Sequence, residues 1–287
     1  MGSSFVDTPR NLNYSATADR LQEFIRATVE AAGFSRLGVA LSGGVDSSAA
    51  AALAARALGP GRIYPILLPY RDWHASDSQR ARELTGALSI PAEQVAAIDI
   101  APMVDSFLGA LRLPPAGSLA DESTPEAALR IGNIMARVRM IVLFDHARRH
   151  QALVLGTENR SEHYLGYYTR FGDEASDLEP LRGLFKTEVV RLARHLGLPS
   201  SIVDAAPSAG LWKGQTDEGE FGFTYAQADA VLYAMFDRQW NEDELVNLGI
   251  PHDVVLKVIA WVRRVEFKRD LPYLGPDPVL AGDGPAP

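Results

Sequence analysis

The stretch LGVALSGGVDSSAAAALAARAL, from Leu37 to Leu58, joins an apolar run, a loop of small residues and an alanine-rich segment. The run Leu37 to Leu41 has the length and composition of a buried strand, and Ser47 to Leu58 those of a helix. The loop between them leaves backbone N–H groups free at a helix start, where an anion binds well. The stretch therefore predicts a strand, an anion-binding loop and a helix.

The alternation of strand and helix continues along the chain. Apolar runs predict further strands at 63–68, 94–100 and 152–155, and helical spacing predicts helices at 16–32, 76–88, 102–111, 126–150 and 186–196. Such an alternation is typical of a parallel sheet with both faces covered. The sequence therefore predicts an α/β fold, a Rossmann-like parallel sheet flanked by helices. Segments 111–125, 167–182 and 208–223 are predicted loops, and loops as long as the last two are often functional or mobile.

Length and composition limit the classes of protein. We expect the 287 residues, 47% of them hydrophobic, to form one domain over 1–287, with an ordered core at about 16–275 and a flexible tail at 276–287. The chain has no cysteine, which excludes disulfides, thiolate metal sites and cysteine nucleophiles. The net charge of -8 argues against nucleic acid and anionic membranes as partners.

The chain also lacks the signals of a membrane or exported protein. No apolar run approaches the roughly 20 residues that cross a bilayer. The start MGSSFVDTPRNLNYS lacks the basic and apolar regions of a signal peptide. We therefore expect a cytoplasmic protein, which fits the absence of cysteine.

The loop from Ser42 to Ser47 fits neither common phosphate motif, since it lacks the lysine of G-x-x-x-x-G-K-[ST] and the spacing of G-x-G-x-x-G. Its glycines nevertheless let the backbone approach a ligand closely, and the hydroxyls of Ser42, Ser47 and Ser48 can donate to phosphate oxygens. Asp46 can bind Mg²⁺, which explains an acid beside a polyphosphate. The alternative is a helix N-terminus that the Asp and Ser residues merely cap.

The SGGVDS sequence of this loop resembles the SGGxDS loop of the N-type ATP pyrophosphatases, which cleave ATP between the α and β phosphates. Three further stretches resemble ammonia-dependent NAD synthetase in the same order and at similar spacing: IGNIMARVRM (131–140), GTENRSEHYLGYYTRFGDEASDLEPLRGLFKTEV (156–189) and PSAGLWKGQTDEGEFGFTY (207–225). The resemblance runs from about Asp19 to Pro272 and implies a fold of the adenine nucleotide alpha hydrolase type.

The resemblance also implies a reaction. Such enzymes adenylate the nicotinate carboxylate of deamido-NAD with ATP and Mg²⁺, and ammonia then displaces AMP to form the amide of NAD. The adenylate is needed because a free carboxylate is a poor acyl donor, whereas a phosphate is a stable leaving group. Glutamine-using relatives carry an added domain with a catalytic cysteine, so we expect this chain, which has none, to use free ammonia.

The resemblance assigns roles to individual residues. Lys186 neutralises the ATP phosphates, Asp46 and Glu162 bind Mg²⁺, and Asp173 positions ammonia or accepts its proton. The remaining ATP contacts are Ala40, Leu41, Ser42, Gly43, Gly44, Val45, Ser47, Thr157 and Ser208. The deamido-NAD contacts are Arg137, Arg170, Asp177, Phe267 and Lys268.

Each of these assignments has a structural alternative. Lys186 is otherwise a solvated charge at a helix end, although a lysine there opposes the helix dipole. Glu162 is otherwise a carboxylate at a helix N-terminus, and Asp173 a turn residue. Phe267 stands where many relatives have His, so a stacking contact replaces any hydrogen bond from that His.

The resemblance further implies a homodimer built on the long helix 126–150, whose apolar residues spread widely around its axis. Two other functions stay open. One is an amide-forming relative that acts on a different carboxylic acid, and the other is a nucleotide-binding regulator without catalysis. The presence of Asp46, Glu162, Asp173 and Lys186 argues against the second.

Overall fold

The structure, a computed structural model, describes residues 9–73, 75–117, 125–208, 216–245, 249–269 and 272–273. Within these ranges the sheet has four parallel strands in the order β3-β2-β1-β4: β1 (Leu37–Ala40), β2 (Ile63–Leu67), β3 (Ala96–Ala97) and β4 (Leu153–Val154). The predicted α/β fold with a parallel sheet is confirmed. That 1–287 forms one domain stays a prediction, and the predicted flexible tail lies outside the described residues.

The strand order places the ends of β1 and β4 side by side. β1 pairs with β2 from Leu37 opposite Ile63 to Ala40 opposite Ile66, and its other edge pairs with β4. After β1 the chain adds β2 and β3 on one side, and it then returns to add β4 on the other. In open α/β sheets, ligands bind at the carboxyl ends of strands where the order reverses, so this edge is where a site is expected.

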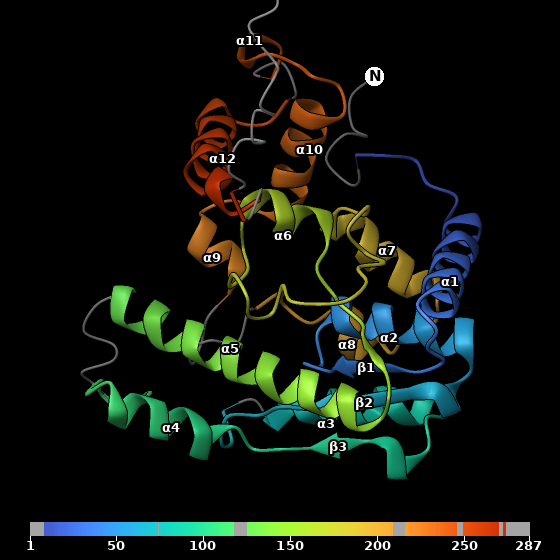
Figure 1. The fold of residues 1–287 in the computed structure, drawn as a ribbon. Helices are drawn as coiled ribbons and strands as arrows, with labels where there is room; N and C mark the ends of the chain where they lie inside the picture. Colours follow the sequence, from blue (N-terminus) through green and yellow to red (C-terminus); the bar gives the residue numbers. More distant parts are fainter. Residues whose placement is uncertain are drawn as a thin grey trace, which may run out of the picture.

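Helices cover both faces of the sheet (Figure 1). α1 (Tyr14–Ala31), α2 (Val45–Leu58), α3 (Ala75–Ala87), α7 (Lys186–His195) and α8 (Ser200–Val203) share one core with β1. α4 (Ala101–Ala110) and α5 (Pro125–Arg149) pack on the opposite face. The alanines Ala49 to Ala52 of α2 are fully buried, and their small side chains let neighbouring helices approach this central helix closely.

A second group of helices lies beyond the carboxyl edge of the sheet (Figure 1). α6 (Arg160–Leu165), α9 (Asp217–Phe221), α10 (Tyr225–Phe236) and α12 (His252–Val265) bury a shared aromatic and aliphatic core, with the short α11 (Glu242–Leu245) beside them. A 3₁₀ turn at Glu266–Lys268 follows α12. This group faces the sheet across the loops that leave β1 and β4.

Two predicted elements differ from the structure. The strand expected at 94–100 is regular only at Ala96–Ala97, because Ala92–Gln94 forms a 3₁₀ turn and Asp99 accepts the Ala101 N–H at the start of α4. The loop expected at 208–223 contains α9, whose first turn carries three acidic residues that suit a helix N-terminus. Residues 209–215 of that loop lie outside the described residues.

The other elements agree with prediction to within a few residues. The helix expected at 126–150 is α5, and segment 167–182 forms turns without helix or strand. In the described part of the chain, no helix is both long and apolar enough to cross a membrane.

Candidate active site

The loop after β1 turns sharply at Gly43. Gly43 has φ +79°, and a Cβ at this position would lie 2.2 Å from the backbone oxygen of Asp77, so a side chain fits neither the conformation nor the space. Arg80 on α3 pairs with Asp77 and donates to the Gly43 carbonyl at 3.1 Å. The glycine therefore lets the loop pack against α3 while its other side faces the cleft.

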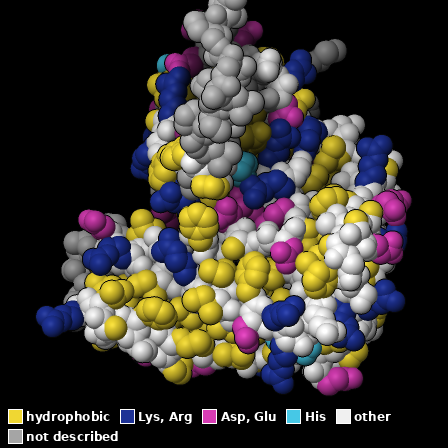
Figure 2. Space-filling model, viewed as in Figure 1, with side chains coloured by type: hydrophobic (Ala, Val, Ile, Leu, Met, Phe, Trp, Pro, Cys, Tyr) yellow, Lys and Arg dark blue, Asp and Glu magenta, His cyan; other side chains and the backbone are white. Residues whose placement is uncertain are grey.

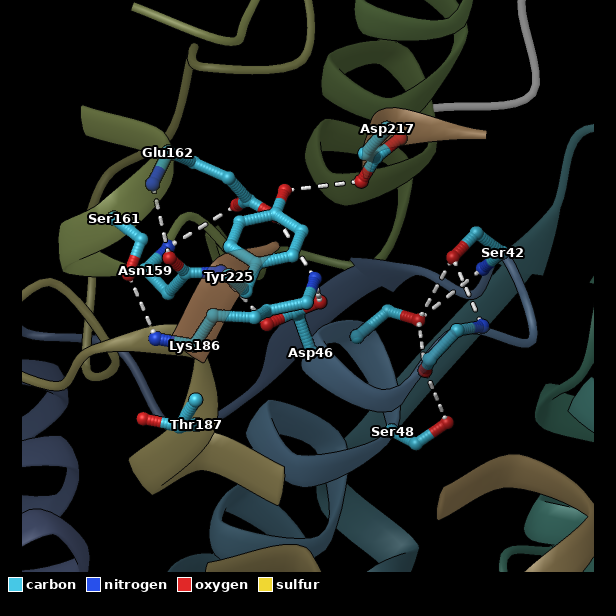
Figure 3. A network of polar contacts seen from close by, with 12 residues as sticks. Ser42, Asp46, Ser48, Asn159, Ser161, Glu162, Lys186, Thr187, Asp217 and Tyr225 are labelled. Atoms are coloured by element: carbon cyan, nitrogen blue, oxygen red, sulfur yellow. Dashed lines mark hydrogen bonds and ion pairs between the residues drawn. The ribbon is translucent and has the colours of Figure 1, made fainter. Parts of the chain in front are cut away.

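Gly44 is the N-cap of α2 and makes no side-chain capping bond. The N–H groups of the first helical turn, which Val45 begins, have no acceptor within the helix. Before the helix, two loop amides donate to serine hydroxyls. The Ser42 N–H donates to Ser47 Oγ at 3.4 Å, and the Gly44 N–H donates to Ser42 Oγ at 3.2 Å (Figure 3). A hydroxyl can rotate away, so the loop keeps the capacity to donate to an anion.

Lys186 joins the two predicted metal ligands. Its Nζ lies 2.5 Å from Asp46 Oδ2 and 3.1 Å from Glu162 Oε1 (Figure 3). Lys186 is the first residue of α7, Asp46 lies in the first turn of α2, and Glu162 lies in α6. Three helix starts therefore direct one ammonium and two carboxylates to a single point. The surface alternative for Lys186 is wrong, since the residue is only 4% exposed.

Burial and charge together set the protonation of this cluster. Burial lowers the pKa of Lys186, but the carboxylates of Asp46 and Glu162 outweigh it and raise that pKa above its usual value. Burial raises the pKa of Glu162 to about 8, against the opposing effect of Lys186. The ammonium is therefore held charged, and the two carboxylates compete for it.

Asn159 completes the cluster. Its Nδ2 donates to Asp46 Oδ1 at 2.9 Å, while its Oδ1 accepts the Glu162 N–H at 3.0 Å. Glu162 Oε2 in turn accepts the Asn159 N–H at 3.3 Å, so the pair forms a capping box on α6. The helix N-terminal interpretation of Glu162 is confirmed, because its Oε2 caps α6, and its other oxygen faces Lys186, where the predicted metal role stays a prediction. The N-x-x-E pattern of a capping box was the available signal for Asn159.

Asp217 and Tyr225 close the cluster from the C-terminal helices, and sequence analysis assigned neither to the site. The Tyr225 hydroxyl donates to Asp217 Oδ2 at 3.0 Å, and Lys186 Nζ lies 5.1 Å from the centre of the Tyr225 ring. Burial raises the pKa of Tyr225 well above its usual value, so the phenol stays protonated. Both residues lie in the stretch 207–225 that resembles the family, but neither was assigned a role, and packing of the C-terminal helices brings them here.

The donor set suits a magnesium ion that arrives with a nucleotide. Asp46 and Glu162 offer carboxylate oxygens, which Mg²⁺ prefers, at a point that already holds a cation. Among the described residues, no group of three or more His, Asp or Glu side chains could hold a metal ion. Two carboxylates suffice only where phosphate oxygens and water supply the remaining ligands.

The cluster lies in a cleft of about 910 Å³ between the sheet edge and the C-terminal helices. This volume is in the range of ligand sites. Sixteen of the predicted site residues line it: Ala40, Leu41, Ser42, Gly44, Val45, Asp46, Ser47, Arg137, Thr157, Glu162, Arg170, Asp173, Lys186, Ser208, Phe267 and Lys268. Gly43 and Asp177 are not among the lining residues. Asp177 instead accepts the Val154 N–H at 2.7 Å beside β4.

Four of the five predicted dinucleotide contacts, all but Asp177, lie along the cleft. Arg137 of α5 donates to the Arg170 carbonyl at 3.2 and 3.3 Å, and the Arg170 guanidinium lies 5.1 Å from the Phe267 ring centre. Lys268 donates to the carbonyls of Gly166 and Tyr168 at 2.6 and 2.9 Å. Phe267 is 48% exposed, so its ring is free to stack on a ligand.

Asp173 lines the cleft and is exposed there. It accepts the Thr169 N–H at 2.9 Å. Burial raises the pKa of Asp173 above its usual value, against this hydrogen bond and the charge of Arg139. Its carboxylate therefore binds a proton more readily than an ordinary aspartate.

An acidic pair of buried Glu158 and half-buried Glu179 was not predicted. Glu158 is 5% exposed and lies 3.1 Å from Arg182, and its N–H donates to Glu179 at 3.0 Å. Burial raises the pKa of Glu158 and of Glu179 to about 8 in each case. Between pH 4.5 and about 8, these carboxyls hold protons that an exposed glutamate would have lost.

Comparisons with known proteins agree with this geometry. The family model described as NAD synthase matches residues 17–272. An NH₃-dependent NAD⁺ synthetase of Chlorobium phaeovibrioides is 39% identical over 92% of this chain and 90% of its own, and one of Thermococcus kodakarensis is 40% identical over 93% and 99%. The structure of an NMN synthetase from Francisella tularensis is 31% identical, with a TM-score of 0.77 over 93% of this chain and all of its own.

Proposed function

The chain belongs to the NAD synthase family, and on that premise we propose that its cleft amidates the nicotinate carboxylate of deamido-NAD with ammonia, at the expense of ATP. The observation that carries this proposal is the meeting of Lys186, Asp46 and Glu162 at the anion-binding loop. The curated relatives are NH₃-dependent NAD⁺ synthetases, which supports this ligase. The products are NAD, AMP and pyrophosphate.

In the first step a carboxylate oxygen of deamido-NAD attacks the α-phosphorus of ATP, and the bond from that phosphorus to the bridging oxygen breaks. The departing pyrophosphate gains charge, so N–H donors and cations beside it lower the barrier. In the proposed site the amides of the Ser42–Ser47 loop and the Lys186 ammonium have this role. When bound at Asp46 and Glu162, Mg²⁺ supplies further positive charge at the phosphates.

In the second step ammonia attacks the acyl carbon, and AMP leaves with the electrons of the broken acyl–oxygen bond. Ammonia reacts only as the neutral base, and the new C–N bond leaves it with a proton to lose. Asp173 is the proposed acceptor, because its carboxylate lies in the cleft and its pKa is raised. A carboxylate also attracts ammonium, the main form of the substrate at neutral pH.

The remaining lining residues are the proposed binding groups. Ala40, Leu41, Thr157 and Ser208 line the cleft beside the phosphate loop and are proposed ATP contacts. Arg137, Arg170, Phe267 and Lys268 are proposed for deamido-NAD, with cations for its phosphates and an exposed ring for stacking. Asp177 stays a proposed contact of the same substrate, although it does not line the cleft of a single chain.

We also propose a homodimer in the cytoplasm. Figure 2 shows hydrophobic side chains gathered over α4 and α5, where Phe107, Leu129 and Ile141 are 48%, 47% and 55% exposed. Exposed apolar patches of this kind favour a protein interface. Sedimentation should give a species of twice 31.2 kDa, and a monomer alone at micromolar concentration would refute the dimer. Cell fractionation tests the location.

The test of the reaction is a mass-spectrometric assay of the products. Deamido-NAD, ATP, Mg²⁺ and ammonium should yield NAD, AMP and pyrophosphate, whereas xanthosine monophosphate and aspartate should not replace deamido-NAD. Nicotinate mononucleotide belongs in the panel because one similar structure is that of an NMN synthetase. Faster amidation of the mononucleotide than of deamido-NAD would change the proposed substrate.

An Asp46→Asn variant is the matched control for this assay. Asparagine keeps the size of the side chain but loses the charge that suits Mg²⁺, so turnover should be abolished while the fold is kept. Near-normal activity would remove Asp46 from the proposed metal site.

A further inference from the structure

A segment ahead of the family match contacts the helix that carries Lys186. The family model begins at residue 17, whereas Arg10 lies before α1, and Figure 1 shows this segment passing beside α7. Arg10 Nε donates to Glu188 Oε1 at 2.8 Å, and its Nη2 donates to Glu188 Oε2 at 2.5 Å. The same Nη2 donates to the Gly183 carbonyl at 2.7 Å. One guanidinium therefore joins the chain before α7 to the first turn of α7.

Glu188 requires this partner. Its side chain is fully buried, and its Oε2 accepts the Phe185 N–H at 2.9 Å, which caps α7. A buried carboxylate is costly unless a cation and hydrogen bonds compensate it. Arg10 supplies both in a bidentate pair, and its guanidinium also lies 5.2 Å from the Phe185 ring centre. Loss of Arg10 would leave Glu188 drawn toward water and away from the cap.

The residue after this cap is Lys186, whose Nζ must reach both Asp46 and Glu162. Three other hydrogen bonds hold the same turn: Lys186 N–H donates to Ser161 Oγ at 2.8 Å, and the Thr187 N–H and hydroxyl donate to Asp229 at 2.9 and 2.8 Å. These fix the turn from the side of α6 and α10. Arg10 is the contact from the opposite side, where it also holds Gly183 in the approach to the helix.

We propose that Arg10 is a positioning residue, which fixes the first turn of α7 so that the Lys186 ammonium lies beside Asp46 and Glu162, where it meets the proposed ATP phosphates. The kinetic part of this inference rests on the proposed function. The positional part does not, because it concerns where the Lys186 ammonium lies in the protein without substrates.

Arg56 provides a control for stability. Its Nη2 donates to the Leu196 carbonyl at 2.6 Å, at the opposite end of α7. Arg10→Ala and Arg56→Ala each remove one guanidinium that contacts α7. Only the Arg10 contact is at the end of α7 that carries Lys186. We expect Arg10→Ala to lose about 8 °C of melting temperature, because it leaves Glu188 buried without its cation, and Arg56→Ala to lose about 3 °C. We expect only Arg10→Ala to lower kcat, by about tenfold, with KM for deamido-NAD unchanged.

Arg10→Lys should recover part of the lost kcat, because it restores the charge beside Glu188. Equal changes in kcat for Arg10→Ala and Arg56→Ala would overturn the proposal, since the effect would then be one of stability alone. If Arg10→Ala does not fold, Arg10→Gln replaces it in every comparison. Wild-type kcat in folded Arg10→Gln would likewise overturn the proposal.

A second readout needs no turnover. Acylation of Lys186 by an amine-reactive reagent, followed by peptide mass spectrometry, measures how well the ammonium is held, because a buried and paired amine reacts slowly. We expect faster labelling in Arg10→Ala than in the wild type and in Arg56→Ala, and equal rates would overturn the proposal. If the wild type made no NAD, the proposed function would fail while this readout still tested Arg10.

Discussion

Replacement of Lys186 by methionine tests the central charge cluster of the site. Methionine keeps the length of the apolar stem but removes the ammonium that Asp46 and Glu162 share at 2.5 and 3.1 Å. The variant should be inactive, because no lysine remains for the phosphates. The more informative result is the change in stability, which the structure allows us to predict.

The expected loss is about 3 kcal/mol. Unit charges about 4 Å apart attract by about 4 kcal/mol at an effective dielectric constant near 20, but desolvation of an ammonium offsets much of this. Removing one partner of a buried pair costs about 3 to 5 kcal/mol. The lower value applies because the Asp46 and Glu162 side chains keep 15% and 17% exposure, so water reaches them. A loss of this size lowers the melting temperature by about 8 °C.

The loss should depend on pH and on magnesium. Burial raises the pKa of Glu162 to about 8, and removal of Lys186 raises it further. A larger share of Glu162 is therefore protonated and without need of a counter-charge at pH 6 than at pH 9, where the wild type has a compensated carboxylate that the variant lacks. The difference in melting temperature should grow from pH 6 to pH 9. Added Mg²⁺ should restore more stability to the variant than to the wild type.

Differential scanning fluorimetry at both pH values measures these changes. Lys257→Met is the control, because Lys257 pairs with Asp253 at 3.0 Å on the surface, where the side chains are 54% and 68% exposed. Its melting temperature should change by no more than about 1 °C. The reasoning is refuted if Lys186→Met destabilises the protein equally at pH 6 and pH 9, or no more than this control does.

Three further predictions concern the loop, the dinucleotide contacts and the buried acids. Gly43→Ala should lower the melting temperature and weaken ATP binding in calorimetry, because its Cβ would lie 2.2 Å from the Asp77 carbonyl oxygen; Gly61→Ala, which meets nothing within 4 Å, should do neither. Arg137→Ala should raise KM for deamido-NAD about tenfold with KM for ATP unchanged, and equal effects would contradict the assignment. Burial raises the pKa of Glu158 from 4.5 to about 8, so the native state holds a proton that the unfolded chain loses, and stability falls as pH rises between these values. Glu158→Gln should therefore raise the melting temperature at pH 9 but not at pH 4, and a gain independent of pH would argue against a titrating Glu158.

Local patterns predicted most of the fold. The helix expected at 126–150 is α5, and the strand expected at 37–41 is β1 to within one residue, because each pattern is long or strongly apolar. The edge strand at 94–100 was predicted too long. Its apolar pattern carries no sign that Asp99 would accept the Ala101 N–H and begin α4.

The site residues likewise divide into those to which a local pattern or the resemblance assigned a role and those to which neither did. The SGGVDS loop could be recognised because its chemistry lies within six consecutive residues, and resemblance added Lys186, Glu162 and the dinucleotide contacts. Asp217 and Tyr225 lie in the resembling stretch 207–225, but neither was assigned a role. They reach Lys186 only because α9 and α10 pack over the carboxyl edge of the sheet.

The sequence by itself determined the α/β alternation, the small-residue loop after the first strand and the family, because each depends on neighbouring residues or on their order along the chain. Only the tertiary structure decided that Lys186 would lie between Asp46 and Glu162, and that Arg10 would reach Glu188 across 178 positions. The physical reason is the strand order. β4 returns to the free edge of β1, which brings α6 and α7 to the start of α2, and there burial holds the charges together.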